Sequence, residues 1–402
     1  MEKLVLYNLR SFDKSRVDNP KLICIGGMQV LSISDYSPNK SPINKDKDHR
    51  FRDMSEYLML PLFIDAHLHI GGIDSILAQY PSDYDLEKFM ENARLTINGA
   101  VYWVRDCGCP DIILDTLKKR CHKELGLRII SSGRPITTPK GHMYPLGIIA
   151  ISPSELKDAV KQIVDSGADF IKVCASGGGL TPSSDPLSTQ YSSDQLKVIV
   201  EEASRYGKKV AAHAHATESI VNCIDAGVNS IEHCSFFAND RGHNYRIECM
   251  ERMKEKGIFF VGTILEQNYS LSTNVSITEQ RRKELGNCIR YLGKIYRDAI
   301  NLGVPFVLAT DAWGLMHPSN RFGGFLEMVG SAVRDYGLSP EEVLNATLDT
   351  PSVLLKQFSA EYIKDDSKDL MIVSKNFLRE PYNPANIACV VSDGVVRKMN
   401  LH

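Results

Sequence analysis

The sequence predicts an α/β protein in which a (β/α)₈ TIM barrel carries a small β-sandwich domain formed by both chain termini. Three observations lead to this expectation. Strand and helix patterns alternate from residue 62 to about residue 356, potential metal ligands recur where those strands end, and the two ends of the chain contain only short strands. Strands alternating with helices are typical of parallel βαβ units, and eight such units close into a barrel.

Composition narrows the class of protein. The chain has 402 residues, a formal net charge of −2 and a hydrophobic fraction of 43%, which suit one large globular barrel with a smaller appendage. The sequence contains neither the basic stripe of a nucleic-acid-binding protein nor the run of 18 or more apolar residues that a membrane span requires. We therefore expect a small-molecule partner, with no nucleic acid and no membrane.

The beginning of the chain and its cysteines indicate a cytoplasmic location. The segment Met1–Tyr7 has the pattern of a strand and lacks the long apolar stretch of a signal peptide. Ten cysteines are scattered without a regular framework, so thiols are expected instead of disulfides. Cys107 and Cys109 are separated by one residue, which is not the usual spacing of zinc ligands, and we interpret them as packing residues.

The domain boundaries follow from these patterns. Residues 1–60 should form the N-terminal part of the small β domain, residues 61–360 the barrel, and residues 361–402 the C-terminal part. Within the first range, the polar stretch 38–57 contains two prolines and is expected to be a mobile surface loop. The short strands predicted at the two ends are Leu4–Leu9, Lys21–Ile25, Gln29–Ser34, Leu370–Val373, Ile387–Val391 and Val395–Lys398.

The barrel elements are predicted from hydrophobic periodicity, with helix starts and stops marked by local signals. Ser152-Pro153 followed by Glu155 is typical of a helix start, and Gly126 and Gly207 are typical stops. After the strand at 62–69, the predicted strands are Ala100–Asp106, Leu127–Ser132, Phe170–Ala175, Val210–His215, Ser230–Cys234, Ile258–Ile264 and Pro305–Thr310. The predicted helices are Pro110–Leu125, Ser152–Ser166, Ser193–Tyr206, Thr217–Ala226, Tyr245–Lys256, Thr278–Leu302, 321–337 and 340–356.

The first barrel strand ends in two histidines, His67 and His69. Residues two apart on a strand point to the same face and lie about 7 Å apart along it. At that separation both imidazoles can reach one metal ion at about 2.0–2.1 Å. A single His-x-His pair is a weak signal, so the strand ends elsewhere decide its meaning.

The other strand ends supply matching side chains. Lys172 ends the fourth strand, His213 the fifth, His233 the sixth and Asp311 the eighth. Active sites of such barrels lie where the carboxyl ends of the strands meet. A lone histidine at a strand end is more often a structural residue, but six matching positions together favour a metal site.

These residues lie in motifs that resemble the amidohydrolase superfamily, in particular its imidazolonepropionase-like and Xaa-Pro dipeptidase-like branch, which includes ochratoxin-type amidases. The resemblance extends from residue 64 to about residue 356. Only Lys368-Asp369-Leu370 remains of the segment that usually closes the family's sequences. The matching motifs are IDAHLHIGG (64–72), GAVYWVRDCG (99–108), SSGRPITTPKGH (131–142), DFIKVCASGGG (169–179), VAAHAH (210–215), GVNSIEHCSFF (227–237) and LATDAWG (308–314).

The resemblance implies a set of metal ligands that agrees with the residue types. One divalent ion would be held by His67, His69 and Asp311, and a second by His213 and His233. Imidazole and carboxylate ligands suit zinc best, although manganese or iron would also fit. In the family a lysine at the position of Lys172 is carboxylated by CO₂, and the carbamate bridges metals about 3.5–4 Å apart. The alternative for Lys172 is an ordinary ion pair at the rim.

The implied reaction is hydrolysis of a C–N amide bond by a metal-bridging hydroxide, in a dipeptide, an N-acyl amino acid or a cyclic amide. Asp311 would take the proton of the water and pass it to the leaving nitrogen. His215 and His142 are second candidates for holding the oxyanion or relaying the proton. The glycines at 177–179 would let the backbone approach the site closely.

Substrate-binding candidates are less specific. Arg105 and Arg134 could bind a substrate carboxylate in a bidentate manner, or form structural ion pairs. Tyr191, Tyr269 and Trp313 could form pocket walls, or could simply pack.

Other functions stay open at this stage. A mononuclear deaminase of a small heterocycle is one, although such relatives lack the bridging lysine, so Lys172 favours two metals. A lactone or phosphoester hydrolase is another, because the same hydroxide attacks those centres. A non-enzymatic barrel would be expected to have lost ligands. The sequence selects neither the substrate nor the oligomeric state, for which a homo-oligomer is the family's suggestion.

Overall fold

The computed structural model describes residues 3–11, 19–37, 49–72, 85–179, 181–182, 184–238, 244–264, 279–314, 321–359 and 369–400. The chain separates into two compact units, one containing Met1–Phe63 with Ile363–His402 and the other Ile64–Tyr362. The architecture is mixed α/β, as predicted. Candidate metal ligands lie in the second unit.

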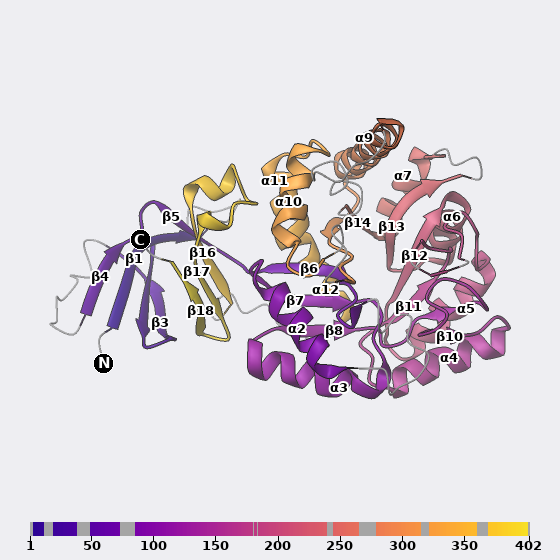
Figure 1. The fold of residues 1–402 in the computed structure, drawn as a ribbon, viewed down its shortest axis with the longest axis horizontal. Helices are drawn as coiled ribbons and strands as arrows, with labels where there is room; N and C mark the ends of the chain where they lie inside the picture. The colour runs from indigo at the N-terminus through magenta and orange to yellow at the C-terminus, as the bar shows by residue number, and fades with distance from the viewer. Residues whose placement is uncertain are drawn as a thin grey trace. The chain divides into compact units, whose positions relative to one another are not determined.

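The first unit is built around one eight-stranded sheet with strands from both ends of the chain. Strand pairing joins the two ends directly, because β5 runs antiparallel to β16 with Met371 opposite Leu60. In sheet order the strands are β2 (Lys21–Gly26), β3 (Gln29–Asp35), β18 (Val395–Met399), β17 (Ile387–Ser392), β16 (Leu370–Ser374), β5 (Tyr57–Leu60), β1 (Lys3–Ser11) and β4 (His49–Asp53) (Figure 1).

The sheet is continuous, whereas the sequence predicted a sandwich. Strand β1 changes neighbours along its length. It pairs with β2 on both sides of a bulge between Leu6 and Leu9, with β4 from Lys3 to Tyr7, and with β5 at Arg10 and Ser11. Asn8 lies in this bulge with a φ of 63°, a conformation that asparagine adopts more readily than most residues. Because β1 also pairs with β2, the sheet order closes on itself around an apolar core that includes Leu6, Ile23 and Val391.

The prediction that residues 38–57 form a loop was wrong for its second half. Residues 38–48 lie outside the described residues, but His49–Asp53 forms β4 and Tyr57 begins β5. Strand β4 pairs in parallel with β1, from His49 opposite Lys3 to Asp53 opposite Tyr7. Backbone pairing at a sheet edge thus overrides a charged composition that is otherwise typical of loops.

The second unit contains two parallel sheets. The three-stranded sheet has the order β6 (Phe63–Leu68), β7 (Val101–Asp106), β8 (Arg128–Ser131). The seven-stranded sheet has the order β10 (Ile148–Ile149), β9 (Ile136–Thr137), β11 (Ile171–Cys174), β12 (Val210–Ala216), β13 (Ser230–Phe237), β14 (Phe259–Thr263) and β15 (Phe306–Ala309). All eight strands predicted for this region are present, and the two-residue strands β9 and β10 are additional.

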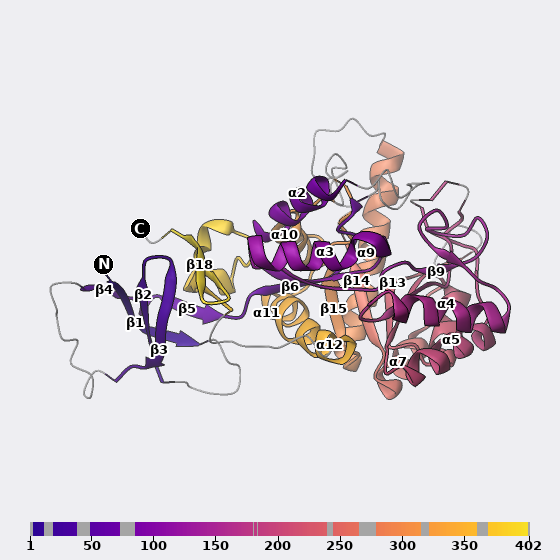
Figure 2. The ribbon, with the colours of Figure 1, turned by 90° about the horizontal axis from the view of Figure 1, so that it is seen from below.

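Helices flank these strands on both sides, as Figure 2 shows. The predicted capping box at Ser152 and Glu155 is confirmed, and the predicted stop at Gly126 has a φ of 74°. The helices are α2 (Leu86–Ile97), α3 (Asp111–Arg120) with the π-turn η2 (Cys121–Leu125), α4 (Pro153–Asp165), α5 (Ser193–Arg205), α6 (Thr217–Ala226), α7 (Ile247–Lys256), α9 (Glu279–Leu302), α10 (Phe325–Arg334), α11 (Pro340–Leu344), η3 (Asn345–Asp349) and α12 (Thr350–Phe358).

Backbone contacts link the two sheets where their ladders end. At one junction, Asp311 N donates to His67 O at 2.8 Å and His69 N donates to Ala312 O at 2.8 Å. At the other, Asp169 N donates to Ser131 O at 2.7 Å. The carboxyl ends of β6 and β15 are therefore neighbours, which places the segment after β15 beside the two histidines of β6.

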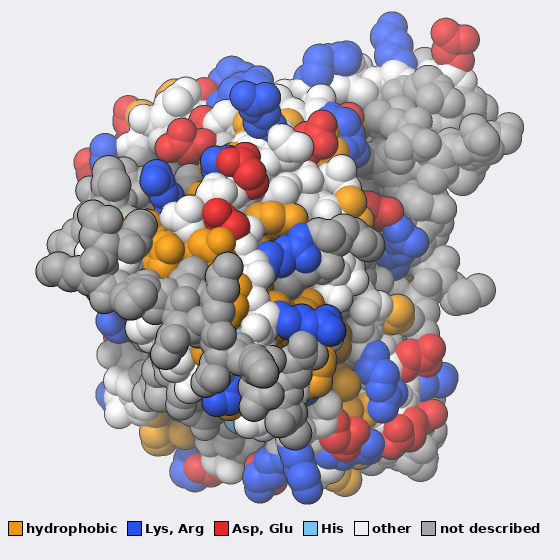
Figure 3. All heavy atoms as spheres, turned by 90° about the vertical axis from the view of Figure 1, so that its left-hand side faces the viewer, with side chains coloured by type: hydrophobic (Ala, Val, Ile, Leu, Met, Phe, Trp, Pro, Cys, Tyr) orange, Lys and Arg blue, Asp and Glu red, His pale blue; other side chains and the backbone are white. Residues whose placement is uncertain are grey.

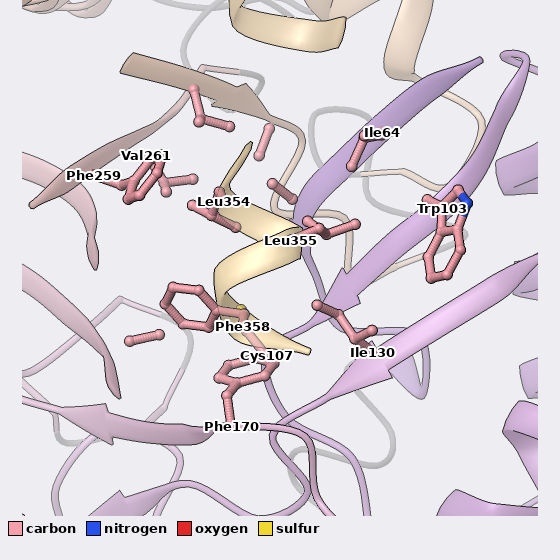
Figure 4. Close-up of a cluster of buried hydrophobic side chains, with 14 residues drawn as sticks. Ile64, Trp103, Cys107, Ile130, Phe170, Phe259, Val261, Leu354, Leu355 and Phe358 are labelled. Atoms are coloured by element: carbon pink, nitrogen blue, oxygen red, sulfur yellow. The ribbon is translucent and has the colours of Figure 1, made fainter. Parts of the chain in front are cut away.

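The two sheets also share one apolar core. Figure 4 shows Leu354, Leu355 and Phe358 of α12 reaching among side chains from strands of both sheets. Ile64 of β6 and Val261 of β14 belong to this cluster although they lie in different sheets. Burial of side chains this size contributes about 1.5–3 kcal/mol each, so α12 stabilises the arrangement of the strands of both sheets.

The surface and the cysteines agree with the composition. Basic and acidic side chains intermingle on the face shown in Figure 3, as expected from a net charge of −2. The ten cysteines are thiols in the structure. Within the described ranges, no helix has the length and apolar character needed to cross a membrane.

Candidate metal centre

The structure brings the two histidines of β6 and the aspartate after β15 together. Asp311 Oδ1 lies 3.4 Å from His67 Nε2 and 3.5 Å from His69 Nε2. The His67 ring is also 5.0 Å from the ring of His233, centroid to centroid. One ligand atom each from His67, His233 and Asp311 can lie within 4.8 Å of one another, a spacing that can hold a metal ion.

A second group of histidines lies beside the first. The ring centroids of His213 and His215 are 4.7 Å apart, and those rings lie 4.6 and 4.7 Å from His233. Ligand atoms of these three residues also fall within 4.8 Å of one another. His233 belongs to both groups, so the two candidate ion positions are adjacent.

Lys172 lies on the strand next to the one that carries His213, opposite Ala211 in the ladder between β11 and β12. It is on β11 with an exposed fraction of only 1%. Burial is the main cause of the lowered pKa values of His67, His142, His213, His215 and His233, and the Lys172 ammonium group lowers each of them further. A lysine inside a cluster of metal-ligand side chains is an unfavourable neighbour unless its charge is removed.

The donor set fits divalent metal ions. Burial, together with neighbouring cationic groups, holds the pKa values of His67, His213 and His233 well below the usual range, so these rings are neutral and retain a lone pair. Among the described residues, the buried atoms His67 Nε2 and His69 Nδ1 have no hydrogen-bond partner. Each such atom costs about 1–3 kcal/mol when left unsatisfied, and a metal ion would satisfy His67 Nε2 beside a carboxylate.

Backbone strain is concentrated at the same strand ends. His233 has a φ of 68° and Asp311 a φ of 51°, both in the left-handed region. Cys234 and Phe236 share this conformation, with φ values of 49° and 51°. Residues other than glycine hold such angles at a cost of about 1–3 kcal/mol each, typically at functional sites. The strain turns the ends of β13 and β15 so that His233 and Asp311 can meet His67.

His142 lies against His213, with the two ring centroids 4.3 Å apart. Its loop is held by Gln190 Oε1, which accepts from His142 N at 2.7 Å. Gly178 lies under the ring: a Cβ atom there would be 2.5 Å from His142 Nδ1. The expected close approach of the glycine-rich backbone therefore occurs at His142.

His215 faces the same cluster. Its Nδ1 is 2.9 Å from Ser235 Oγ, and its ring stacks on Phe237 with centroids 5.5 Å apart. Burial lowers the pKa of His215 to about 4, although Asp311 acts in the opposite direction. His215 is thus a neutral imidazole next to His213 and His233.

Three of the substrate-binding candidates follow their structural alternative, because their side chains are engaged inside the protein. Arg105 is fully buried, and its three nitrogens donate to Ala66 O, Ser230 Oγ and Glu232 Oε2. Tyr191 is 1% exposed, and its hydroxyl donates to Ala150 O. Arg134 donates to the carbonyls of Leu146 and Gly147, and so supports the loop that carries His142.

The remaining predicted wall residues differ from these. Trp313 is half-buried and packs against Met143, Leu146 and Cys174 close to the loop of His142. Tyr269 lies outside the described residues. Cys107 lies near His67 and Glu232, but burial raises its pKa to about 12, so it stays a neutral thiol, in agreement with the packing interpretation.

Two buried carboxylates next to the site were missed. Glu232 Oε2 lies 2.6 Å from His67 Nδ1. Asp65 accepts from Thr310 Oγ1 at 2.5 Å and from Thr310 N at 3.1 Å, which ties β6 to the end of β15. Both residues lie inside otherwise apolar strands, where a carboxylate needs polar partners. A carboxylate within such a strand therefore indicates a buried polar partner. The sequence does not identify that partner, because it lies 165 residues away for Glu232 and 245 residues away for Asp65.

Comparisons with known proteins identify relatives of this chain. The sequence matches the amidohydrolase family over residues 58–352. It is 30% identical over 292 residues to an ochratoxinase of Aspergillus niger, and the alignment covers 63% of this chain and 58% of that protein. The match thus spans little more than half of the relative's length.

Solved structures show the same fold. A Xaa-Pro dipeptidase with methionine bound in its active site has a TM-score of 0.75 at 22% identity, over 99% of this chain and 100% of that one. A prolidase complexed with N-methylphosphonate-L-proline has a TM-score of 0.75 at 20% identity, also over 99% and 100%. Because the family match covers most of the sequence, this chain belongs to the amidohydrolase family.

Proposed function

We propose that the protein is a binuclear metal-dependent amidohydrolase that cleaves a C–N amide bond in a dipeptide, an N-acyl amino acid or a cyclic amide. The observation that carries the proposal is the buried cluster in which histidines of β6, β12 and β13 lie close to one another and to Asp311, with the buried Lys172 on the neighbouring strand β11. Support comes from the family, whose members are generally metal-dependent, and from relatives named ochratoxinase, Xaa-Pro dipeptidase and prolidase.

The proposed catalytic domain is a closed (β/α)₈ barrel over residues 61–360, with the small β domain contributed by 1–60 and 361–402. The backbone contacts at both junctions of the two sheets support closure. The shared core around α12 supports it as well. In a closed barrel, the eight carboxyl strand ends would surround one site.

In this proposal His67, His69 and Asp311 hold one ion, and His213 and His233 hold the other, with zinc the best match to the ligand types. The Lys172 ammonium would lose one proton to give a neutral amine, whose Nζ would bond to the carbon of CO₂ as a second proton leaves. This would replace a cation with an anionic carbamate able to face both ions. Bound there, the ions would supply a water with a pKa near 7 and a polarised carbonyl oxygen.

Asp311 is the proposed proton carrier. Its Oδ1 atom, placed between the two imidazoles of β6, would accept the proton of the attacking water and return it to the leaving nitrogen. An amide nitrogen leaves only after protonation, so this second transfer is required. His215 and His142 would act as neutral N–H donors to the developing oxyanion.

Trp313 is the remaining candidate for a substrate wall. It is half-buried beside Met143 and Leu146, so an apolar group of the substrate could pack on its open side. The buried thiols support a reducing compartment, and we propose the cytoplasm.

The function is tested by metal analysis of protein purified without chelator, followed by a screen of Xaa-Pro and Xaa-Arg dipeptides and N-acyl amino acids. We expect about two ions per chain, hydrolysis of at least one amide class, and loss of activity on metal removal with recovery on adding Zn²⁺ or Mn²⁺. One ion per chain with release of ammonia from a heterocycle would favour a deaminase instead. Protein without bound metal or metal-dependent hydrolysis would refute the proposal.

Substitution of Gly178, which lies next to the His142 ring, should reduce activity, whereas substitution of the neighbouring Gly179 should not. In Gly178→Ala the new methyl group would displace the His142 ring, and a catalytic group displaced by about 1 Å can lose about 100-fold in rate. The matched control is Gly179→Ala, because no atom lies within 4 Å of a Cβ there. Steady-state kinetics and thermal unfolding of both variants provide the test; equal activities would show that the position of His142 is unimportant.

A further inference from the structure

We propose that Glu232 is a positioning residue that fixes the tautomer and the ring orientation of His67, so that Nε2 presents its lone pair to the first metal ion. The inference rests on the proposed function and extends it to a residue outside the predicted ligand set. It concerns how the chain prepares one ligand before any substrate binds.

The geometry of His67 supports this role directly. Its two ring nitrogens face opposite groups: Nδ1 lies 2.6 Å from Glu232 Oε2, and Nε2 lies 3.4 Å from Asp311 Oδ1. A carboxylate only accepts hydrogen bonds, so Nδ1 carries the proton and Nε2 is left with its lone pair. Both side chains, His67 and Glu232, are fully buried, so water does not compete for Nδ1.

Glu232 is itself held from the other side. Its Oε2 also accepts from Arg105 Nη2 at 2.6 Å, and its Oε1 accepts from Ser230 Oγ at 2.5 Å. Arg105 Nε donates in turn to Ala66 O at 2.6 Å. Every polar atom of the carboxylate therefore has a partner, which gives the acceptor for His67 one fixed position.

Arg105 is anchored in the apolar core. Its guanidinium lies 4.9 Å from the ring centroid of Phe358 and 5.5 Å from that of Phe170. Its positive charge balances the negative charge of Glu232, which would otherwise be costly in a fully buried position. A continuous set of buried contacts therefore runs from the core through Arg105 and Glu232 to His67, the arrangement by which carboxylates commonly orient metal-bound histidines.

The alternative is that Arg105 and Glu232 form an ion pair that serves the fold alone. Two variants distinguish the cases. Glu232→Leu combined with Arg105→Met removes both charges together, a replacement that buried pairs often tolerate, and it leaves His67 Nδ1 without its acceptor. Glu232→Gln keeps an oxygen that can accept from Nδ1, and serves as the conservative rescue.

The first readout is Zn²⁺ affinity, measured by competition with a chromophoric chelator on refolded or chelator-stripped protein. We expect the double variant to bind the tighter ion about 10- to 100-fold more weakly than wild type, and Glu232→Gln to recover most of this loss. The second readout is the ¹⁵N NMR spectrum of the His67 ring without metal, which should show one protonated Nδ1 in wild type and a mixture of tautomers in the double variant.

The outcomes separate this inference from the proposed function. A double variant that folds and binds Zn²⁺ as tightly as wild type, with one unchanged His67 tautomer, overturns the role of Glu232 and leaves the metal enzyme intact. If the double variant does not fold, the NMR spectrum of Glu232→Gln is compared with that of wild type. A His67 ring whose Nδ1 carries no proton in both proteins would overturn the inference. Wild-type protein that binds no Zn²⁺ overturns both.

Discussion

Lys172→Ala should abolish amide hydrolysis, with kcat at least about a thousandfold lower, equivalent to about 4 kcal/mol of transition-state stabilisation. The reason is that Lys172 is 1% exposed on the strand next to that of His213, where its carbamate could bridge two cations. Removing it should also lower bound metal from about two ions per chain toward one. Steady-state kinetics and metal analysis on the same preparation measure both effects.

Lys118→Ala is the matched control. Lys118 is another largely buried lysine. It lies in α3, and its Nζ is 2.8 Å from Asp169 Oδ2. Its loss should reduce thermal stability and leave kcat and the metal content unchanged. If Lys172→Ala retained two ions and more than a tenth of wild-type kcat, Lys172 would be an ordinary buried lysine and the bridging role would be wrong.

Asp311→Asn should reduce kcat by about 10²- to 10⁴-fold, the range expected for loss of a general base and acid. The amide keeps the size of the side chain and an oxygen near His67 and His69, so we expect KM to change little. The change removes the group that would carry the proton from water to the leaving nitrogen. Steady-state kinetics with a series of amide substrates would test this role. We expect kcat to fall more for substrates with poor leaving groups than for substrates with good ones.

Asp335→Asn provides the comparison for this substitution. Asp335 follows α10. Its backbone N–H donates to Ser331 O at 2.8 Å, and its Oδ2 accepts from the Ser331 hydroxyl at 2.9 Å. It lies outside the ligand groups, so this variant should have wild-type kinetics. A similar modest loss in both variants, independent of the leaving group, would contradict proton transfer by Asp311.

Much of the fold was predictable because its signals are local. Periodicity identifies a strand such as Ile258–Ile264 or a helix such as Ser193–Tyr206 from a single window of sequence. The ends of parallel strands in turn indicate which distant side chains meet, and this reasoning brought Lys172 and Asp311 together with His67. Most residues of the candidate ligand groups could therefore be predicted from the sequence.

The rest depended on contacts that no local pattern encodes. The sequence left Arg105 as either a substrate contact or part of a structural ion pair. Its partners are Ala66, Ser230 and Glu232, and the last two lie more than 120 residues away in the sequence. Strand β4 was missed because pairing with β1 overrides its charged composition. A charged residue in a strand indicates that it needs a partner, but not which partner it has.

The most direct measurement is anomalous X-ray scattering at the zinc absorption edge from crystals of protein purified without chelators. We predict two peaks, one bounded by His67, His69 and Asp311 and the other by His213 and His233, with density for a carboxylated Lys172 between them. Crystals of zinc-supplemented protein with no peak among these residues, or with Lys172 directed away from them, would contradict the account.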